Sequence, residues 1–444
     1  MTTGSIAKHL IMFAIPLFIG SFFQQLYNAV DSIIVGNYVG KEALAAVGCI
    51  TPIINTFIHT FGGFATGAGV VISNYYGAKD DEKLERAVQT TILSTIILCV
   101  FFTAVGVLYT SRLLQLMQTP DDVFPYARSY LRIIFFGISS MLMYNVGAGI
   151  LRAVGDSTRP LYYLIICTVI NTILDLVFVK QLHMGVAGAA YATVIAQTIS
   201  TILVFIQLYL SDKAYRFNPA KLSIDSRILR KICAFGLPTS IQMCITAFSN
   251  VFVQSYVNRF GAAVMAGWAT YVKIDAFVTQ PVLALGASIT TFVGQNIGAR
   301  KYDRVKPTPR YAFFIGLIVI TVIITPIMIF SETFVSFFSN ETEVLEFGLF
   351  FVRLITPYML FSLILQIYAG MLRGSGDSIP SMVILTLSFV VIRQIYLYIV
   401  WQISPSIGSV GFGYPIGWIL CAVIISVYYY TSSKVVREIF PKDL

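Results

Sequence analysis

The stretch LRAVGDS at Leu151–Ser157 returns as LRGSGDS at Leu372–Ser378, 221 residues further along a chain of 444 residues. Three other landmarks return in the same order at nearly the same distance. Because the four landmarks return in the same order and at nearly the same offset, we predict that the chain consists of two copies of a single structural unit. The other landmarks are FAIP and FGLP (ending at Pro16 and Pro238), YYGAK and QNIGAR (ending at Lys79 and Arg300), and GVAGAAY and GSVGFGY (ending at Tyr191 and Tyr414).

The composition is that of a membrane protein. The chain is 57% hydrophobic and 11% charged, with a mean hydropathy of +0.79. Apolar runs recur along its whole length, and each has at least about the 20 residues that a helix needs to cross ~30 Å of hydrocarbon. Because the runs are continuous and do not alternate, they predict helices and not barrel strands. We expect twelve spans, at residues 8–36, 43–75, 87–111, 124–151, 160–180, 184–210, 228–258, 263–296, 308–330, 346–371, 379–402 and 408–433.

The span count fixes how the copies relate to each other. Six spans is an even number, so both copies enter the membrane the same way up, and their pseudo-two-fold axis runs along the membrane normal. We therefore predict an all-α integral membrane protein of two six-helix lobes, residues 1–210 and 228–444, joined by a basic cytoplasmic linker at 211–227. A cleft that opens alternately to either side between two such lobes is typical of transporters.

The distribution of Lys and Arg predicts the orientation. Segments on the side of the N-terminus carry 21 of these residues and the opposite segments carry six. This asymmetry places both termini in the cytoplasm and the protein in the cell membrane as a multi-pass protein. The net charge of +9 reflects the same asymmetry and gives no reason to expect a nucleic acid partner. Six cysteines in apolar runs and three scattered histidines show no metal-ligand spacing.

The two copies disagree where the first copy carries buried polar residues. A charged Asp at bilayer depth costs ~2.5–3.5 kcal/mol on insertion scales, and intramembrane acids are usually functional. Repeats share what the fold needs, so the differences between them point to function. The pairs are Asp31 with Val253, Asp175 with Ile395 or Tyr396, and Thr193 with Ile416.

Further polar side chains share a helix face with each acid. Asn171 precedes Asp175 by four residues and Tyr27 precedes Asp31 by the same interval, so each pair lies on one face. Thr193 adds a hydroxyl from the sixth run. We predict a pocket that holds a proton, because neighbouring carboxyl groups in a low dielectric do not both ionise easily, or a sodium ion on hard oxygen ligands. A polar cluster that only ties helices together is the structural alternative.

Other polar residues within the runs are weaker candidates for the wall of a substrate cavity. Lys273 and Asp275, two residues apart in the second copy, are expected to form an ion pair. Arg393 would meet either a substrate or a counter-ion of its own. Asn145 and Gln366 occupy equivalent positions before the two LRxxGD motifs, and helix packing explains them as well as a place in the cavity does.

Each GDS motif predicts the start of a helix. Gly155 is expected to take a left-handed backbone conformation after the fourth span, and Asp156 or Ser157 to cap the fifth. We expect the same arrangement in the second copy, at 376–378.

These features together resemble the multidrug and toxic compound extrusion (MATE) family. The shared features are twelve spans in a 6+6 repeat, a proline and an acid in the first run, GAK or GAR after helices two and eight, and paired LRxxGD motifs. The resemblance implies an antiporter that extrudes organic, often cationic, compounds in exchange for protons or sodium ions. The family's functional positions match Asp31, Asn171, Asp175, Thr193 and Tyr27, with Asn145 near that site and a helix-one hinge at Pro16.

One departure from the family concerns the second lobe. A branch of the family places acids in helices seven and ten, where this chain has Thr246 and Ser362. The resemblance is therefore to the branch with its acidic cation site in the amino-terminal lobe, and we expect coupling there.

Other classes of function share parts of this pattern. A flippase for lipid-linked substrates has the same scaffold, but its cavity needs several cations for pyrophosphate, and only Lys273 and Arg393 are available. An enzyme would need a nucleophile with a base, or a metal cluster, at depth, and the sequence offers neither; a channel is disfavoured by the repeat and the acidic pocket. We expect a monomeric transporter of small organic substrates in the lipid bilayer, with no enzymatic activity and no cofactor besides the coupling proton or sodium ion.

Overall fold

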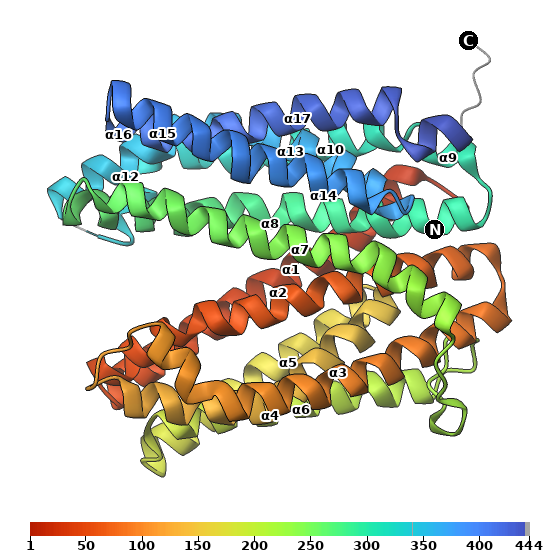
Figure 1. The fold of residues 1–444 in the computed structure, drawn as a ribbon, viewed down its shortest axis with the longest axis horizontal. Helices are drawn as coiled ribbons and strands as arrows, with labels where there is room; N and C mark the ends of the chain where they lie inside the picture. Colours follow the sequence, from red (N-terminus) through yellow and green to blue (C-terminus); the bar gives the residue numbers. More distant parts are fainter. Residues whose placement is uncertain (340, 440–444) are drawn as a thin grey trace. The chain divides into compact units, whose positions relative to one another are not determined.

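The computed structural model describes residues 1–339 and 341–439, in which all regular structure is helical (Figure 1). Twelve stretches are long and apolar enough to cross a membrane, which confirms the predicted span count. The first repeat contains α1 (Ile6–Tyr38), α2 (Lys41–Ala78), α3 (Asp81–Leu116), α4 (Phe124–Ala153), α5 (Thr158–Asp175) continued by the π-helix η1 (Leu176–Gln181), and α6 (Gly185–Tyr209).

The second repeat follows the short turn η2 (Pro219–Lys221). Its first two spans are the single helices α7 (Ser226–Asn258) and α8 (Ala262–Gly298), and each of its other spans is built from two or three consecutive helical pieces. These are α9 (Tyr302–Val305) with α10 (Thr308–Ile329), α12 (Thr342–Ile355) with η3 (Thr356–Tyr358) and α13 (Met359–Gly374), α14 (Ser378–Thr386) with the π-helix η4 (Leu387–Ile392) and α15 (Arg393–Ile403), and α16 (Ile407–Gly411) with α17 (Gly413–Thr431) and η5 (Val435–Ile439). The short helix α11 (Ser331–Ser336) lies between α10 and α12.

The repeat is visible in the backbone at helix ends. Lys79 after α2 and Arg300 after α8 both have φ of 56°, a left-handed conformation that side chains other than Gly rarely adopt. Gly155 and Gly376, after the fourth span of each repeat, have φ of 98° and 80°. The left-handed glycines of the GDS motifs are thus confirmed, because each turn must reverse the chain directly after a helix.

The capping prediction holds in one copy only. Asp156 Oδ1 accepts hydrogen bonds from the backbone N–H groups of Thr158 and Arg159, at 3.2 and 3.1 Å, and so caps α5. The prediction for Asp377 is wrong. Its Oδ2 accepts from the hydroxyl of Tyr428 at 3.1 Å and from the backbone N–H of Lys434 at 3.0 Å. The end of α17 offers these donors to the second carboxylate, so Asp377 holds α17 and not its own helix.

The chain folds as two compact units. The amino-terminal unit is Pro16–Gly236, and the carboxy-terminal unit is Leu237–Leu444 together with Met1–Ile15. In the amino-terminal unit α4 packs against α2, α3 and α6, and in the carboxy-terminal unit α8 packs against α12 and α13. Each unit has its own buried apolar core. The division falls inside α1 and α7, beside a proline in each helix.

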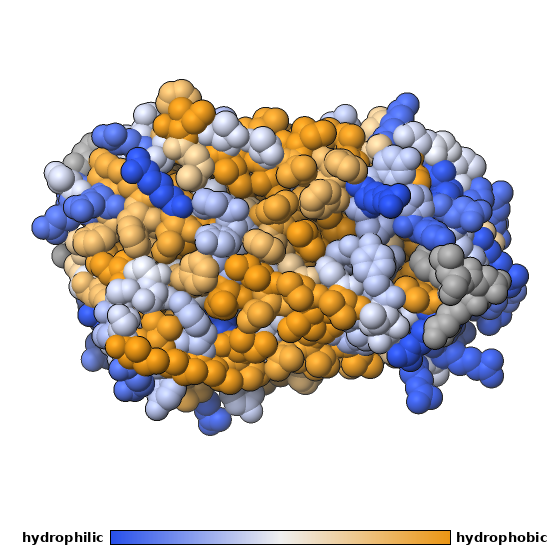
Figure 2. Space-filling model, turned by 90° about the horizontal axis from the view of Figure 1, so that it is seen from above, coloured by the Kyte–Doolittle hydropathy of each residue, from blue (hydrophilic) through white to orange (hydrophobic). Residues whose placement is uncertain are grey.

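Large apolar side chains cover the middle of the spans. Leu108 and Phe136 are each 77% exposed, and Ile318 is 65% exposed. Figure 2 shows apolar residues gathered over the middle of the visible face and hydrophilic residues at its two ends. Such surfaces are unfavourable in water and favourable in a bilayer, so the structure is that of a multi-pass membrane protein.

Candidate ion site

Three helices of the amino-terminal unit bring the predicted polar residues together. Asp31 comes from α1, Asn171 and Asp175 from α5, and Thr193 from α6. All four are buried: Asn171 and Asp175 are 0% exposed, Thr193 is 4% and Asp31 is 6%. Because the first and fifth spans are far apart in sequence, only the tertiary fold makes this a cluster.

The acids interact with each other and with phenol groups. Asp31 and Asp175 lie near enough to each other to interact electrostatically. The phenol of Tyr130 on α4 lies beside Asp31, and Thr193 lies near the phenols of both Tyr130 and Tyr27. Tyr27 is half-buried. The five predicted residues therefore occur at one place, with Tyr130 as a sixth member.

Most polar atoms of this cluster lack a partner. Six of its side-chain atoms have no hydrogen bond to any described residue, although water does not reach them. Leaving one buried polar group unsatisfied costs about 1–3 kcal/mol. A group of them in one place is therefore typical of a site that receives a proton, an ion or ordered water. The atoms are Asp31 Oδ1, Asp175 Oδ1 and Oδ2, Asn171 Oδ1 and Nδ2, and Thr193 Oγ1.

The backbone changes its winding directly after Asp175. The α-helix α5 ends there and continues as the π-helix η1. The extra residue per turn of a π segment re-aims the side chains around it, and such segments are frequent at functional sites. The fifth span of the second repeat also contains a π-helix, η4, which ends just before Arg393. The repeats thus share the irregular winding but place different charges beside it.

The sequence analysis missed Tyr130, although the sequence held a signal for it. Tyr130 is 5% exposed and lies on α4, so no helical spacing links it to Asp31. In the second repeat its counterpart at an offset of 221 is Phe351. The comparison of repeats that singles out Asp31 would also have singled out this hydroxyl.

Arg393 has partners of its own in the carboxy-terminal unit. It is 2% exposed, and its Nη2 donates to Ser249 Oγ at 2.7 Å and to Asn250 Oδ1 at 2.9 Å. The guanidinium carbon lies 5.1 Å from the centre of the Tyr414 ring, within the range of a cation–π contact. Arg393 therefore joins α15 to α7 through neutral groups.

The predicted ion pair between Lys273 and Asp275 is wrong. Asp275 accepts hydrogen bonds of 3.1 Å from the hydroxyls of Tyr271 and Thr279, one turn before and after it. The Lys273 ammonium instead lies 5.3 Å from the centre of the Phe338 ring. Residues two apart on a helix point in nearly opposite directions, and this geometry separates the two charges.

The remaining candidates lie on separate helices. Asn145 donates to the carbonyl of Met141 in its own helix at 2.8 Å, and Gln366 Oε1 accepts from Arg373 at 3.5 Å. Both are half-buried. Pro16 lies inside α1 at the first residue of the amino-terminal unit.

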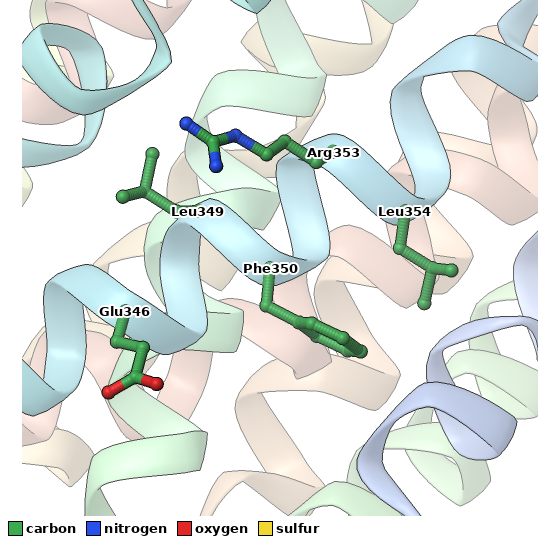
Figure 3. Close-up of a pocket in the computed structure, with 5 residues that line it drawn as sticks. All are labelled: Glu346, Leu349, Phe350, Arg353 and Leu354. Carbon is green, nitrogen blue, oxygen red and sulfur yellow. The ribbon is translucent and has the colours of Figure 1, made fainter.

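One surface pocket lies away from all of these residues. It is formed along α12 in the carboxy-terminal unit, and Figure 3 shows its lining side chains projecting from a single helix. Phe350 is 41% exposed, and Arg353 reaches Ser331 Oγ at 3.4 Å. A depression along a single helix cannot surround a ligand, and it adds nothing to the buried cluster. The lining residues are Glu346, Leu349, Phe350, Arg353 and Leu354.

Two equivalent sets of six spans, one of which encloses a cluster of buried acids, define a two-repeat membrane transporter. The family model described as MatE matches residues 16–177 and 238–399, once in each repeat, and the chain belongs to this family. Its members are transporters, not enzymes. The two matches begin 222 residues apart, at Pro16 and Pro238, and so confirm the internal repeat.

Similar proteins cover nearly the whole chain. Two proteins of Bacillus subtilis (strain 168), "Probable multidrug resistance protein YoeA" and "Probable multidrug resistance protein YpnP", are 31% and 28% identical to it. Each alignment covers 96% of this chain, with 94% of YoeA and 96% of YpnP. A MOP superfamily transporter from Pyrococcus furiosus has the same fold, with a TM-score of 0.90 at 24% identity over 96% of this chain and 95% of that one.

Proposed function

We propose that this protein exports organic, often cationic, compounds in exchange for protons or sodium ions, and that the coupling ion binds at Asp31 and Asp175. The names of YoeA and YpnP support multidrug export as the general activity. The observation that carries the proposal is the set of six unpartnered polar atoms around the two carboxyl groups. A proton would remove one of two neighbouring charges, and a sodium ion would be held by oxygens that otherwise have no partner.

The site would be coupled to transport through α1. Asp31 lies on this helix beyond Pro16, and α1 passes from one compact unit to the other at that proline. Pro16 has no N–H to bond the carbonyl of Met12, so the helix bends most easily there. A bound ion and a bound drug then favour different shapes of α1, and each lowers the affinity for the other.

The orientation and the division into lobes belong to the same proposal. Both termini and the segment 211–227 would face the cytoplasm, since Lys and Arg concentrate on that side. In this segment Lys221 donates to Glu85 on α3 at 2.8 Å. A cysteine in place of the exposed Asp212 tests the orientation. It should react with an impermeant maleimide only after the membrane is opened; labelling in intact cells would contradict it.

Proteoliposomes loaded with ethidium test the proposed exchange. A proton gradient and a sodium gradient are imposed separately on the wild-type protein, and ethidium movement is followed by its fluorescence. We expect one of the gradients to drive ethidium against its own gradient, and that gradient names the coupling ion. Movement that responds to neither gradient would contradict antiport and favour a flippase for a lipid-linked substrate, which shares this scaffold.

A further inference from the structure

The first helix begins in one unit and continues into the other. The base of α1 (residues 6–15) belongs to the carboxy-terminal unit, together with the five residues before it, and the rest of α1 belongs to the amino-terminal unit. Leu10 is 0% exposed and lies in the core of the carboxy-terminal unit. Its carbonyl oxygen accepts a hydrogen bond of 3.1 Å from the hydroxyl of Ser288 on α8. The base is therefore held by apolar burial and by a polar contact.

An arginine after α8 holds the chain segment that precedes α1, here named the strap (Met1–Ser5). Arg304 donates from Nη1 to the carbonyl oxygen of Gly4 at 2.7 Å and from Nη2 to that of Met1 at 3.2 Å. Its Nε donates to Asn296 Oδ1 at 3.1 Å, and the Asn296 side chain is fully buried on α8. All three guanidinium nitrogens are thus used to join the strap to α8, a fixed geometry that a lysine cannot reproduce.

The other repeat holds its first helix in the corresponding way. Ile232, the counterpart of Leu10 at an offset of 222, is 0% exposed and lies in the core of the amino-terminal unit. Its carbonyl oxygen meets Gly67 on α2, the counterpart of Ser288 at an offset of 221. Each repeat's first helix therefore begins in the unit that is built mainly from the other repeat. Because this arrangement occurs in both repeats, it is a property of the repeat and does not depend on the strap.

We propose that Arg304 is a positioning residue for transport, which fixes the base of α1 to the carboxy-terminal unit so that ion binding at Asp31 bends α1 at Pro16. This inference rests on the proposed function above. If the base of α1 were free, a displacement of Asp31 on ion binding would move the whole helix as a rigid body. Because the base is fixed, the helix must instead bend to allow this displacement, and it bends at Pro16, where the backbone hydrogen bond is missing. Arg304 acts without contacting the ion or the substrate.

The test separates ion binding from transport. Arg304→Ala removes the two bonds of Arg304 to the strap and leaves those from Lys301 to the carbonyl of Thr2 and from the Met1 ammonium to Gln295. Arg304→Lys keeps the charge but not the fork of donors. Arg310→Ala is the matched control, because it removes the same charge from an exposed position six residues further on. Gradient-driven ethidium export and the rise in melting temperature on adding sodium or lowering pH are measured on each purified variant, with Asp31→Asn alongside.

We expect Arg304→Ala to keep the ion-dependent rise, with its midpoint within about twofold, and to export ethidium roughly tenfold more slowly, as changes along a coupling route do. Arg304→Lys should recover part of the rate, and Arg310→Ala should match the wild type. Wild-type export by Arg304→Ala, or loss of the ion response in step with export, would overturn the inference. Wild-type coupling in Asp31→Asn would instead overturn the proposed function.

Ser288→Ala keeps the inference testable if Arg304→Ala does not fold. It removes only the hydroxyl that binds the carbonyl of Leu10, inside the same anchor. We expect Ser288→Ala to slow export less than Arg304→Ala does and to leave the ion-dependent rise in melting temperature unchanged. Unchanged export in Ser288→Ala and Arg304→Lys together would also count against the anchor.

Discussion

Gly67 on α2 lies so close to α7 that a Cβ atom at this position would overlap the carbonyl oxygen of Ile232. The same atom would stand 2.5 Å from the backbone N of Gly236. Backbone atoms cannot rotate away as a side chain can, so only glycine permits this crossing of the two helices. Small residues at such crossings are what allows helices in membranes to approach closely.

Gly67→Ala should therefore destabilise the amino-terminal unit. Overpacking a well-packed contact costs typically about 1–3 kcal/mol, and the melting temperature in detergent should fall accordingly. Gly69→Ala is the matched control on the same helix, because an added Cβ there would have no described atom within 4 Å. The control should be neutral or slightly stabilising, since Ala favours a helix by about 1 kcal/mol over Gly. Equal melting temperatures for the two variants would contradict the crossing.

Asn171→Leu should separate function from stability. The amide of Asn171 is buried and has no hydrogen-bond partner among the described residues, so an apolar side chain of similar size removes a cost. The melting temperature should stay level or rise. The ion concentration for half-maximal transport should rise roughly tenfold, which corresponds to ~1.4 kcal/mol of lost binding. A lower melting temperature with unchanged ion dependence would mean that Asn171 only ties helices together.

Asp275→Asn should have the opposite effect to Asn171→Leu, because it should lower the melting temperature and leave the ion dependence of transport unchanged. Both carboxylate oxygens of Asp275 already accept hydrogen bonds, from Tyr271 and Thr279. An amide would present an N–H group to one of these donors, and the unmade bond costs about 1–3 kcal/mol. We expect a lower melting temperature and gradient-driven export that still responds to the coupling ion. Loss of that response would place a coupling acid in the carboxy-terminal unit as well.

Arg393→Met should loosen the contact between α7 and α15. It removes the charged donor to Ser249 Oγ and Asn250 Oδ1, and a hydrogen bond to a charged group contributes about 1.5–3 kcal/mol. Arg393→Lys should not restore the melting temperature, because an ammonium lacks the planar fork of donors. Full recovery with lysine would mean that only the positive charge matters there.

The apolar runs were sufficient to predict all twelve spans, because a bilayer tolerates only long, internally bonded helices. Local motifs predicted less well where distant donors compete. Asp156 caps its own helix, whereas Asp377 binds the end of α17, and nothing in the nearly identical motifs distinguishes them. Helical spacing likewise argued against the Lys273–Asp275 pair that proximity in sequence favoured.

The comparison of equivalent positions in the two repeats was sufficient to predict part of the candidate site. Asp31, Asp175 and Thr193 stood out because their counterparts are apolar, and the structure places them together with Asn171. The π-helix after Asp175 was not predictable, because its winding depends on tertiary contacts and not on a residue pattern. That α1 and α7 each pass from one compact unit to the other was not predictable either, because it too depends on tertiary contacts.

The most direct test of coupling at the amino-terminal site is gradient-driven ethidium export by Asp31→Asn, compared with the wild type in matched proteoliposomes. Replacing the carboxylate by an amide keeps its shape and removes its negative charge, so it removes the group that binds the ion. The account predicts that export no longer follows the imposed proton or sodium gradient while the melting temperature is kept. Export that still follows the gradient at the wild-type rate would show that Asp31 is structural and that coupling lies elsewhere.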